Sequence, residues 1–507
     1  MLFNSFLFLL FFAAVYVIYW LLPSRYRPGV LIIGSVIFYA TWGLNREGWW
    51  GIRWTVHFIG LVVLNYFMVE WMLRHHARRK MIMALTVIIN LLNLALFKYF
   101  GFFVRMTADL GLDLPPFVEN MNLFLPLAIS FYTFQLTAYV VDVYRGVITE
   151  EIKFSRFFLF ILFFPQLIAG PIMRSTDFLP QSAFIDKERI YRGCWLFISG
   201  LIKKVLVADP MSSIVSAVFA APELYTGWSI MLAGMSFSVQ IYCDFSGYTD
   251  IARGSALLLG YDIPENFKAP FFSASARELW QRWHITLATW LRDYIYFPLG
   301  GSKVSAGRTY INQIITFALG GLWHGADYTY VLWGTMWGVL LAGERMIEQL
   351  LGLKTTPDKN GPVKILKILL MFSLFSFSAL MFRAHPVQYK GMEISSTEIM
   401  GQMISGLFTH GSHHLTEYYE EAGGDTETLE SVFGSEIFRS QEMSQLDTIA
   451  VMFLVAFFFH WVQYKPQHFQ RFRRYEFWLL LILGTLLGGW MLPALSQSGH
   501  QFIYFVF

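Results

Sequence analysis

Stretches of about twenty apolar residues recur along this chain, and they restrict its possible folds more than any other feature. A membrane-spanning helix needs about 20 mostly apolar residues, and a helix satisfies its own backbone hydrogen bonds in lipid. The clearest runs cover residues 2–22, 54–69, 81–97, 121–141, 157–173, 224–243, 328–343, 368–382, 449–462 and 477–492. Shorter or interrupted runs cover residues 28–42, 191–207 and 311–323. The pattern predicts an all-α polytopic integral membrane protein with about 10–13 membrane helices.

Composition supports a membrane protein and excludes several other classes. Hydrophobic residues make up 55% of the 507 residues and charged residues only 14%. Soluble proteins carry about 25% charged residues, so this chain has too few charges to cover a soluble surface. The formal net charge of +3 is too small to indicate a nucleic-acid partner. Cys194 and Cys243 form no Cys-x-x-Cys pair, which argues against a disulfide framework or a zinc–thiolate site.

Charged residues predict the orientation of the chain in the bilayer. Basic clusters at residues 25–27, 74–80, 354–367 and 465–474 are expected to face the cytoplasm. Residues 385–447 are hydrophilic and their charged residues are mostly acidic, so we place them and both chain ends outside. The first apolar run ends at arginines and not at a small-residue cleavage site, so we interpret it as a retained span.

These features divide the chain into three predicted regions. Residues 1–383 would form a membrane-embedded core, with a catalytic region at 240–334. Residues 384–447 would form an acidic extracytoplasmic loop, and residues 448–507 the C-terminal membrane helices. Between residues 244 and 303, charged residues, glycines and prolines leave no clean lipid-facing helix. Because irregular backbone at membrane depth must be buried or line a cavity, we expect re-entrant and in-plane helices around a central tunnel.

Two histidines are candidates for chemistry. His324 lies in FALGGLWHGADYTYVLWG, with apolar residues on both sides. Ionisable residues inside membrane segments are rare and usually functional, and an imidazole suits a general base. The alternative is a structural histidine bonded to a neighbouring helix. His284 lies in ELWQRWHITLATWLRDYIYFPLGG, where apolar residues follow near-helical spacing. This segment is interpreted either as an in-plane amphipathic helix with salt bridges or as a helix carrying a second site histidine.

Nearby charged residues have structural and functional interpretations. Asp244 and Asp250, in IYCDFSGYTDIARG, would orient a histidine or substrate, or pair with Arg253 or Arg282 to stabilise the fold. We favour the structural role. Lys203 and Lys204 would mark a cytoplasmic helix end, with a contact to a cofactor phosphate as the alternative.

Metal, nucleotide and serine-hydrolase chemistry have little support. Residues 410–414 (HGSHH) are a weak metal signal, and a solvated loop is the preferred interpretation, so no metal is expected. The sequence contains no Walker motif, dinucleotide-binding loop or Gly-x-Ser-x-Gly elbow. Nothing therefore suggests a protein driven by ATP or a serine hydrolase.

Long motifs in the central region resemble the membrane-bound O-acyltransferase (MBOAT) superfamily. The resemblance is closest to the bacterial branch that acetylates alginate or transfers D-alanine to teichoic acids. It covers most of the chain, and Arg253 departs from the small or apolar residue expected there. The matching stretches are FPQLIAGPIMR (164–174), GLIKKVLVAD (200–209), QIYCDFSGYTDIARG (240–254), PENFKAPFFSASARELWQRWHITLATWLRDYIYFPLGGSK (264–303), FALGGLWHGADYTYVLWG (317–334) and FIYFVF (502–507).

The resemblance implies roles for individual residues and for partners. His324 matches the histidine usually taken as the catalytic base, and His284 matches the second histidine of the branch. Substrate-tunnel or supporting positions would be Asp244, Asp250, Trp283, Arg282, Trp323 and Asn266. Acetyl-CoA would be the acyl donor, with no permanently bound cofactor. An extracytoplasmic acetyl-accepting or acetyltransferase protein and a polysaccharide would be partners at a bacterial inner membrane.

Other functions stay open at this point. A D-alanyl relative would use the same mechanism with a carrier-protein thioester as donor. A transporter or channel would use the buried His and Asp residues as a proton path. A structural platform for a separate periplasmic transferase would need neither histidine.

Overall fold

The protein is almost entirely helical. The computed structural model describes residues 3–112, 114–119, 121, 123–168, 170–352, 361–389, 392–409 and 436–464. The predicted all-α class is confirmed, with one small exception. Strand β1 (Val387–Tyr389) pairs antiparallel with strand β2 (Met392–Ile394). The described residues form two units, one from the ranges 3–201 and 248–266 and the other from the ranges 202–247 and 267–464.

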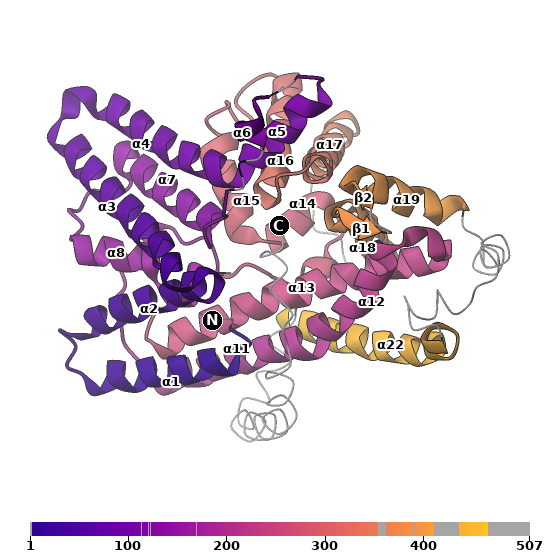
Figure 1. Cartoon of the computed structure of the whole chain (residues 1–507), viewed down its shortest axis with the longest axis horizontal. Helices are drawn as coiled ribbons and strands as arrows, with labels where there is room; N and C mark the ends of the chain where they lie inside the picture. The colour runs from indigo at the N-terminus through magenta and orange to yellow at the C-terminus, as the bar shows by residue number, and fades with distance from the viewer. Residues whose placement is uncertain are drawn as a thin grey trace. The chain divides into compact units, whose positions relative to one another are not determined.

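The first unit begins with helices joined by short turns. Its longer helices are α1 (Phe6–Leu21), α2 (Arg27–Glu47), α3 (Ile52–Arg74), α4 (Arg79–Leu94), α5 (Phe100–Asp109), α7 (Ile129–Arg145) and α11 (Lys187–Leu201). Helix α2 packs on α1 and α3, and α4 packs on α3 and α7 (Figure 1). The amides of Asn65 on α3 and Asn90 on α4 exchange hydrogen bonds of 2.9 and 2.8 Å. Both side chains are buried, and such polar pairs stabilise contacts between apolar helices.

One predicted apolar span in the first unit is broken. The sequence suggested a continuous run over residues 157–173, and this prediction is wrong. Helix α8 (Phe154–Leu162) ends before Phe163, and the four-residue helix α9 (Phe164–Leu167) follows with Pro165 near its start. Proline lacks an N–H and clashes with the preceding turn, so a helix does not continue through it. The resulting pieces are buried and too short to cross a bilayer alone.

The second unit contains the C-terminal half of the described chain. Its helices are α12 (Asp209–Ala220), the first part of α13 (Gly227–Leu258), α14 (Ala276–Arg282), α15 (Ile285–Leu291), α16 (Ala306–His324), α17 (Tyr328–Leu350), α18 (Pro362–Arg383), α19 (Ser396–Thr409) and α22 (Glu436–Tyr464). The predicted external loop thus contains a hairpin, α19 and the start of α22. The histidines at 410–414 lie outside the described residues. The three-region division remains a prediction.

Four segments of the described chain are long and apolar enough to cross a membrane. They are residues 27–74, 76–109, 362–383 and 447–464, and the first contains both α2 and α3. Helix α1 is apolar but shorter. The count of 10–13 crossings and the central tunnel remain predictions.

The polar segment after residue 243 differs partly from expectation. Helix α13 continues through it to Leu258, whereas we expected interrupted structure from Asp244 onward. Every residue from 241 to 257 is buried, so this part of α13 does not face lipid, as expected. Only short helices and irregular backbone follow between residues 259 and 303.

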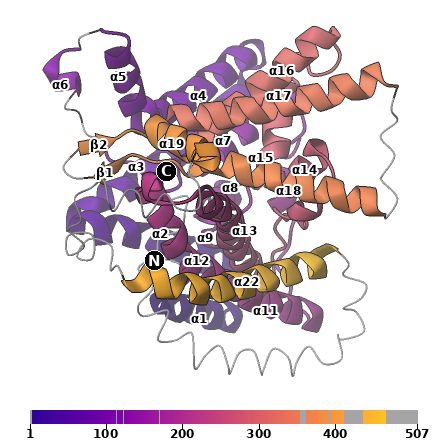
Figure 2. The ribbon, with the colours of Figure 1, turned by 90° about the vertical axis from the view of Figure 1, so that its right-hand side faces the viewer.

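Glycines allow α16 and α17 to pack closely. The two helices form an antiparallel pair and run side by side (Figure 2). A Cβ added at Gly321 of α16 would collide with the carbonyl oxygen of Tyr330, and one added at Gly334 of α17 with that of Phe317. The two backbones therefore meet at positions where no side chain fits, as in other close helix pairs of membrane proteins.

We expect Gly334→Ala to destabilise the protein and to lower activity. The new methyl group would force α16 and α17 apart, and such overpacking costs about 1–3 kcal/mol. Gly343→Ala on the same helix is the matched control, because a Cβ there meets nothing within 4 Å. Thermal unfolding in one detergent would compare both variants with the unaltered protein. Equal midpoints for the two variants would contradict the packing explanation.

Candidate functional site: a buried histidine pair

His284 lies at a break between two short helices. The sequence suggested one continuous helix here, and this prediction is wrong. Helix α14 ends at Arg282, and α15 begins at Ile285. Between them His284 has φ 42° and ψ 53°, in the left-handed region that non-glycine residues rarely adopt. Such a conformation costs about 1–3 kcal/mol and is found mostly at functional sites.

His324 is the last residue of α16. A three-residue turn follows it, and Asp327 caps α17 by accepting a hydrogen bond of 3.1 Å from the backbone N–H of Thr329. The ring centroids of His324 and His284 lie 6.2 Å apart. Both residues are buried. The fold thus brings together the two histidines that the sequence singled out.

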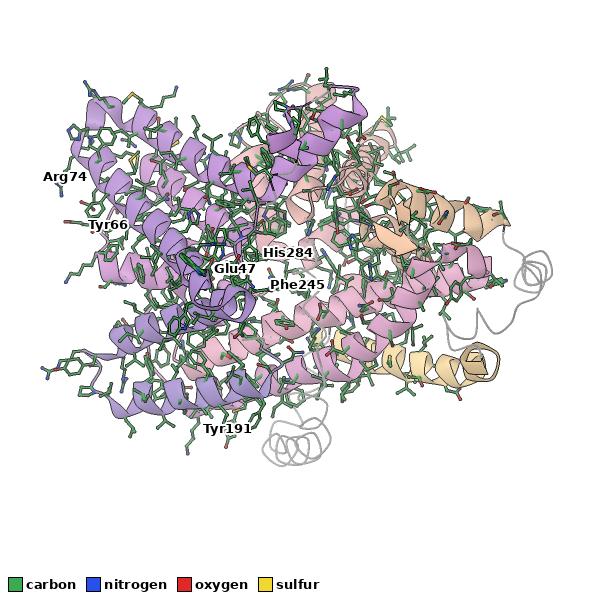
Figure 3. The ribbon with its side chains drawn as sticks, in the orientation of Figure 1. Glu47, Tyr66, Arg74, Tyr191, Phe245 and His284 are labelled. Atoms are coloured by element: carbon green, nitrogen blue, oxygen red, sulfur yellow. The ribbon has the colours of Figure 1, made fainter. Side chains whose placement is uncertain are left out.

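Aromatic side chains surround the histidine pair. The ring of Phe245, on α13, lies 4.7 Å from that of His284, and Figure 3 labels both residues. Trp323 lies 5.7 Å from His284 and 4.9 Å from His324. On the other side of His324 are Trp333 at 5.3 Å and Phe382 at 5.2 Å. These rings shield the two imidazoles from water.

Neither ring nitrogen of His284 has a hydrogen-bond partner within the described part of the chain. Leaving a buried polar group without a partner costs about 1–3 kcal/mol, so a purely structural role would not explain this histidine. Both nitrogens are available to a substrate. Sequence reasoning missed Phe245, Trp333 and Phe382 as neighbours of the pair. Phe245 directly follows Asp244 in a motif already singled out, whereas nothing near Phe382 in the sequence indicated its place.

Asp244 takes part in a buried ion-pair cluster. The Nζ atom of Lys204 lies 2.7 Å from Oδ1 of Asp244 and 2.6 Å from Oδ1 of Asp209. The favoured structural role for Asp244 is consistent with this geometry, but neither expected arginine is its partner. Lys203 and Lys204 are buried within a π-helical turn, residues 202–208. The helical backbone continues from α11 through this turn into α12, so their interpretation as a cytoplasmic helix end is wrong.

The two arginines pair elsewhere. Arg253 lies 3.3 Å from Glu265, and Arg282 lies 2.8 Å from Glu278. The position at which Arg253 departs from the family pattern thus holds a buried arginine with an acidic partner.

The other predicted site residues have separate surroundings. Trp283 packs on Phe267 at 5.1 Å and on Phe375 at 4.8 Å. Asp250 and Asn266 are buried in the first unit. Their roles remain predictions. Across the described ranges, no group of three or more His, Cys, Asp or Glu side chains is arranged to hold a metal ion.

These observations define a helical membrane protein with two histidines in a dry, aromatic environment. A family model for membrane-bound O-acyltransferases matches residues 147–383, which include both histidines and the aromatic rings around them. The chain belongs to the membrane-bound O-acyltransferase family. It is therefore a membrane-bound enzyme that transfers acyl groups to hydroxyls.

Curated relatives have three kinds of named activity. The chain is 36% identical to the probable alginate O-acetylase of Pseudomonas aeruginosa, over 82% of this chain and 76% of that protein. It is 31% identical to the peptidoglycan O-acetyltransferase of Helicobacter pylori, over 83% of each chain. It is 28% identical to the teichoic acid D-alanyltransferase of Bacillus subtilis, over 53% of this chain and 71% of that protein.

Proposed function

We propose that this protein transfers acetyl groups from cytoplasmic acetyl-CoA across the bacterial inner membrane, toward hydroxyls of an extracytoplasmic polysaccharide. The buried pair of His284 and His324, with ring centroids 6.2 Å apart, is the observation that carries the proposal. The names of the more similar relatives support an acetyl group, since both alginate O-acetylase and peptidoglycan O-acetyltransferase match over more than four fifths of this chain.

His324 is the general base in this mechanism. Its unprotonated nitrogen takes the proton of the acceptor hydroxyl while the oxygen attacks the thioester carbonyl. The tetrahedral intermediate collapses, the carbon–sulfur bond breaks, and the departing thiolate recovers the proton from the imidazolium. The products are the acetyl ester and CoA, and His324 is again neutral.

His284 and the aromatic rings supply the surroundings for this step. A ring N–H of His284 would donate a hydrogen bond to the oxyanion, and such donors contribute more where water is excluded. Phe245, Trp323, Trp333 and Phe382 limit access of water, which would otherwise hydrolyse the thioester. The acceptor hydroxyl belongs to the polysaccharide itself or to an extracytoplasmic partner protein that passes the acetyl group on.

D-alanyl transfer from a carrier-protein thioester is the second candidate. The match to the teichoic acid D-alanyltransferase favours it, but that match covers only 53% of this chain. Both candidates use the same histidines and differ in the donor.

The test supplies purified full-length protein in nanodiscs with either radiolabelled acetyl-CoA or a D-alanyl carrier-protein thioester. Candidate glycans and a co-encoded periplasmic protein are added as acceptors. Release of CoA with label passing to an acceptor is expected. Turnover of the carrier thioester, with no turnover of acetyl-CoA, would mean that the carrier thioester is the donor. Movement of donor or glycan across the membrane without any acyl transfer would favour the transport function instead.

A further inference from the structure

A second polar cluster lies next to the histidine pair. Arg383 is the last residue of α18, directly after Phe382, whose ring lies 5.2 Å from that of His324. The Nη2 atom of Arg383 donates a hydrogen bond of 3.3 Å to the hydroxyl of Ser216. Its guanidinium carbon lies 5.7 Å from the ring centroid of Phe219. The side chain is partly buried, and within the described ranges it makes no ion pair.

Tyr330 and His385 belong to the same cluster. The hydroxyl of Tyr330 lies 3.5 Å from Nε2 of His385, and the ring of Tyr330 lies 5.0 Å from that of Phe382. Arg383 interacts electrostatically with both residues. A Cβ added at Gly325 would collide with the Tyr330 ring, so this ring lies against the residue that follows His324. The cluster therefore reaches the catalytic histidine from the end of α18.

The charge of Arg383 needs an explanation. Burying a guanidinium without a counterion is costly, whereas Lys204 and Arg277 of the same unit each have a carboxylate partner. A helix C-terminus stabilises a cation by only about 0.3–1 kcal/mol. An anion supplied by a ligand would complete the cluster.

We propose that Arg383, with Tyr330 and His385, forms a subsite that binds an anionic group of the acyl acceptor, a carboxylate or a phosphate. A guanidinium binds either group with two parallel hydrogen bonds. The Tyr330 hydroxyl and the His385 ring would bind neighbouring sugar oxygens. The subsite would hold the acceptor so that its hydroxyl lies beside His324. This inference rests on the proposed function and deepens it, because it specifies an acidic glycan as the acceptor.

Matched acceptors test the subsite on the full-length protein in nanodiscs. They are a carboxylated oligosaccharide, its carboxyl-reduced neutral form and a phosphorylated oligosaccharide. Arg383→Gln is expected to raise KM for the anionic acceptor by about 10–100-fold, because charge-assisted hydrogen bonds contribute about 1.5–3 kcal/mol. The kcat value and the KM for the acyl donor should change little. KM for the neutral acceptor should not change. Whichever anionic acceptor loses affinity identifies the group as carboxylate or phosphate.

Two further variants separate binding from folding. Arg383→Lys keeps the charge and should recover part of the affinity for the anionic acceptor. Arg292→Gln is the matched control, because this arginine is about half exposed and pairs with its neighbour Asp293. Its kinetics should equal those of the unaltered protein. Equal effects of Arg383→Gln on anionic and neutral acceptors, or no effect on either, would overturn the proposal.

Direct binding of the oligosaccharides, without donor, distinguishes this proposal from the proposed function. If the unaltered protein transfers no acyl group, but binds the anionic oligosaccharide in a way that depends on Arg383, the subsite stands and the acetyl-transfer function fails. Binding that Arg383→Gln leaves unchanged, measured alongside normal acyl transfer, overturns the subsite alone.

Discussion

Replacing His324 by glutamine is expected to lower kcat for acyl transfer by about 10²–10⁴-fold, the contribution usual for a general base. Glutamine fills similar space and forms hydrogen bonds, but it cannot take a proton from the acceptor hydroxyl. Acceptor binding should persist, so KM should change far less than kcat. CoA release and labelled product, measured at saturating substrate, would check both values.

His57→Gln is the matched control for this experiment. His57 is a half-buried histidine on α3, where its ring contacts Phe97, and it belongs to the first unit, whereas His284 and His324 belong to the second. Near-normal turnover is expected from this variant. His284→Ala should lower kcat by about 10²–10³-fold if the ring donates to the oxyanion. If His324→Gln retained full turnover, the general base would have to be another group.

Lys204→Met is expected to cause the largest loss of stability, about 3–5 kcal/mol. Removing one partner of a buried ion pair is strongly destabilising, and Lys204 pairs with two carboxylates, Asp209 and Asp244. Both lie within 2.7 Å of the lysine Nζ atom, and all three side chains are at most 8% exposed. The cluster also fixes the start of α12 against α13, which carries Phe245 onto His284. Activity should therefore fall together with stability.

Thermal unfolding at a fixed scan rate in one detergent would measure the effect. Arg292→Met removes a half-exposed arginine from its pair with Asp293 and should cost less than about 1 kcal/mol. A triple variant, Lys204→Met with Asp209→Asn and Asp244→Asn, should recover most of the lost stability, because the two carboxylates that paired with Lys204 are then replaced by neutral amides. A midpoint for Lys204→Met equal to that of the unaltered protein would show that the cluster does not stabilise the fold.

Apolar periodicity predicted the helical membrane class correctly because a bilayer-spanning helix must be apolar over most of its length. Predictions made from the local sequence were wrong at two places. His284 lies in a segment with near-helical spacing, yet the backbone breaks there into α14 and α15. Adjacent lysines suggested a cytoplasmic helix end, yet the helix continues past Lys204, which is buried with two aspartates. Spacing along one segment carries no information about partners from distant helices.

The sequence by itself determined the membrane class, the family and the identity of the two histidines, because these depend on composition and on motifs of contiguous residues. Only the tertiary structure decided that the histidine rings lie 6.2 Å apart, that Asp244 pairs with Lys204, and that Phe382, next to Arg383, lies against His324. Each of these depends on the packing of helices far apart in the chain. Burial determines the free-energy cost of each charged side chain, and only the packed helices decide which side chains are buried.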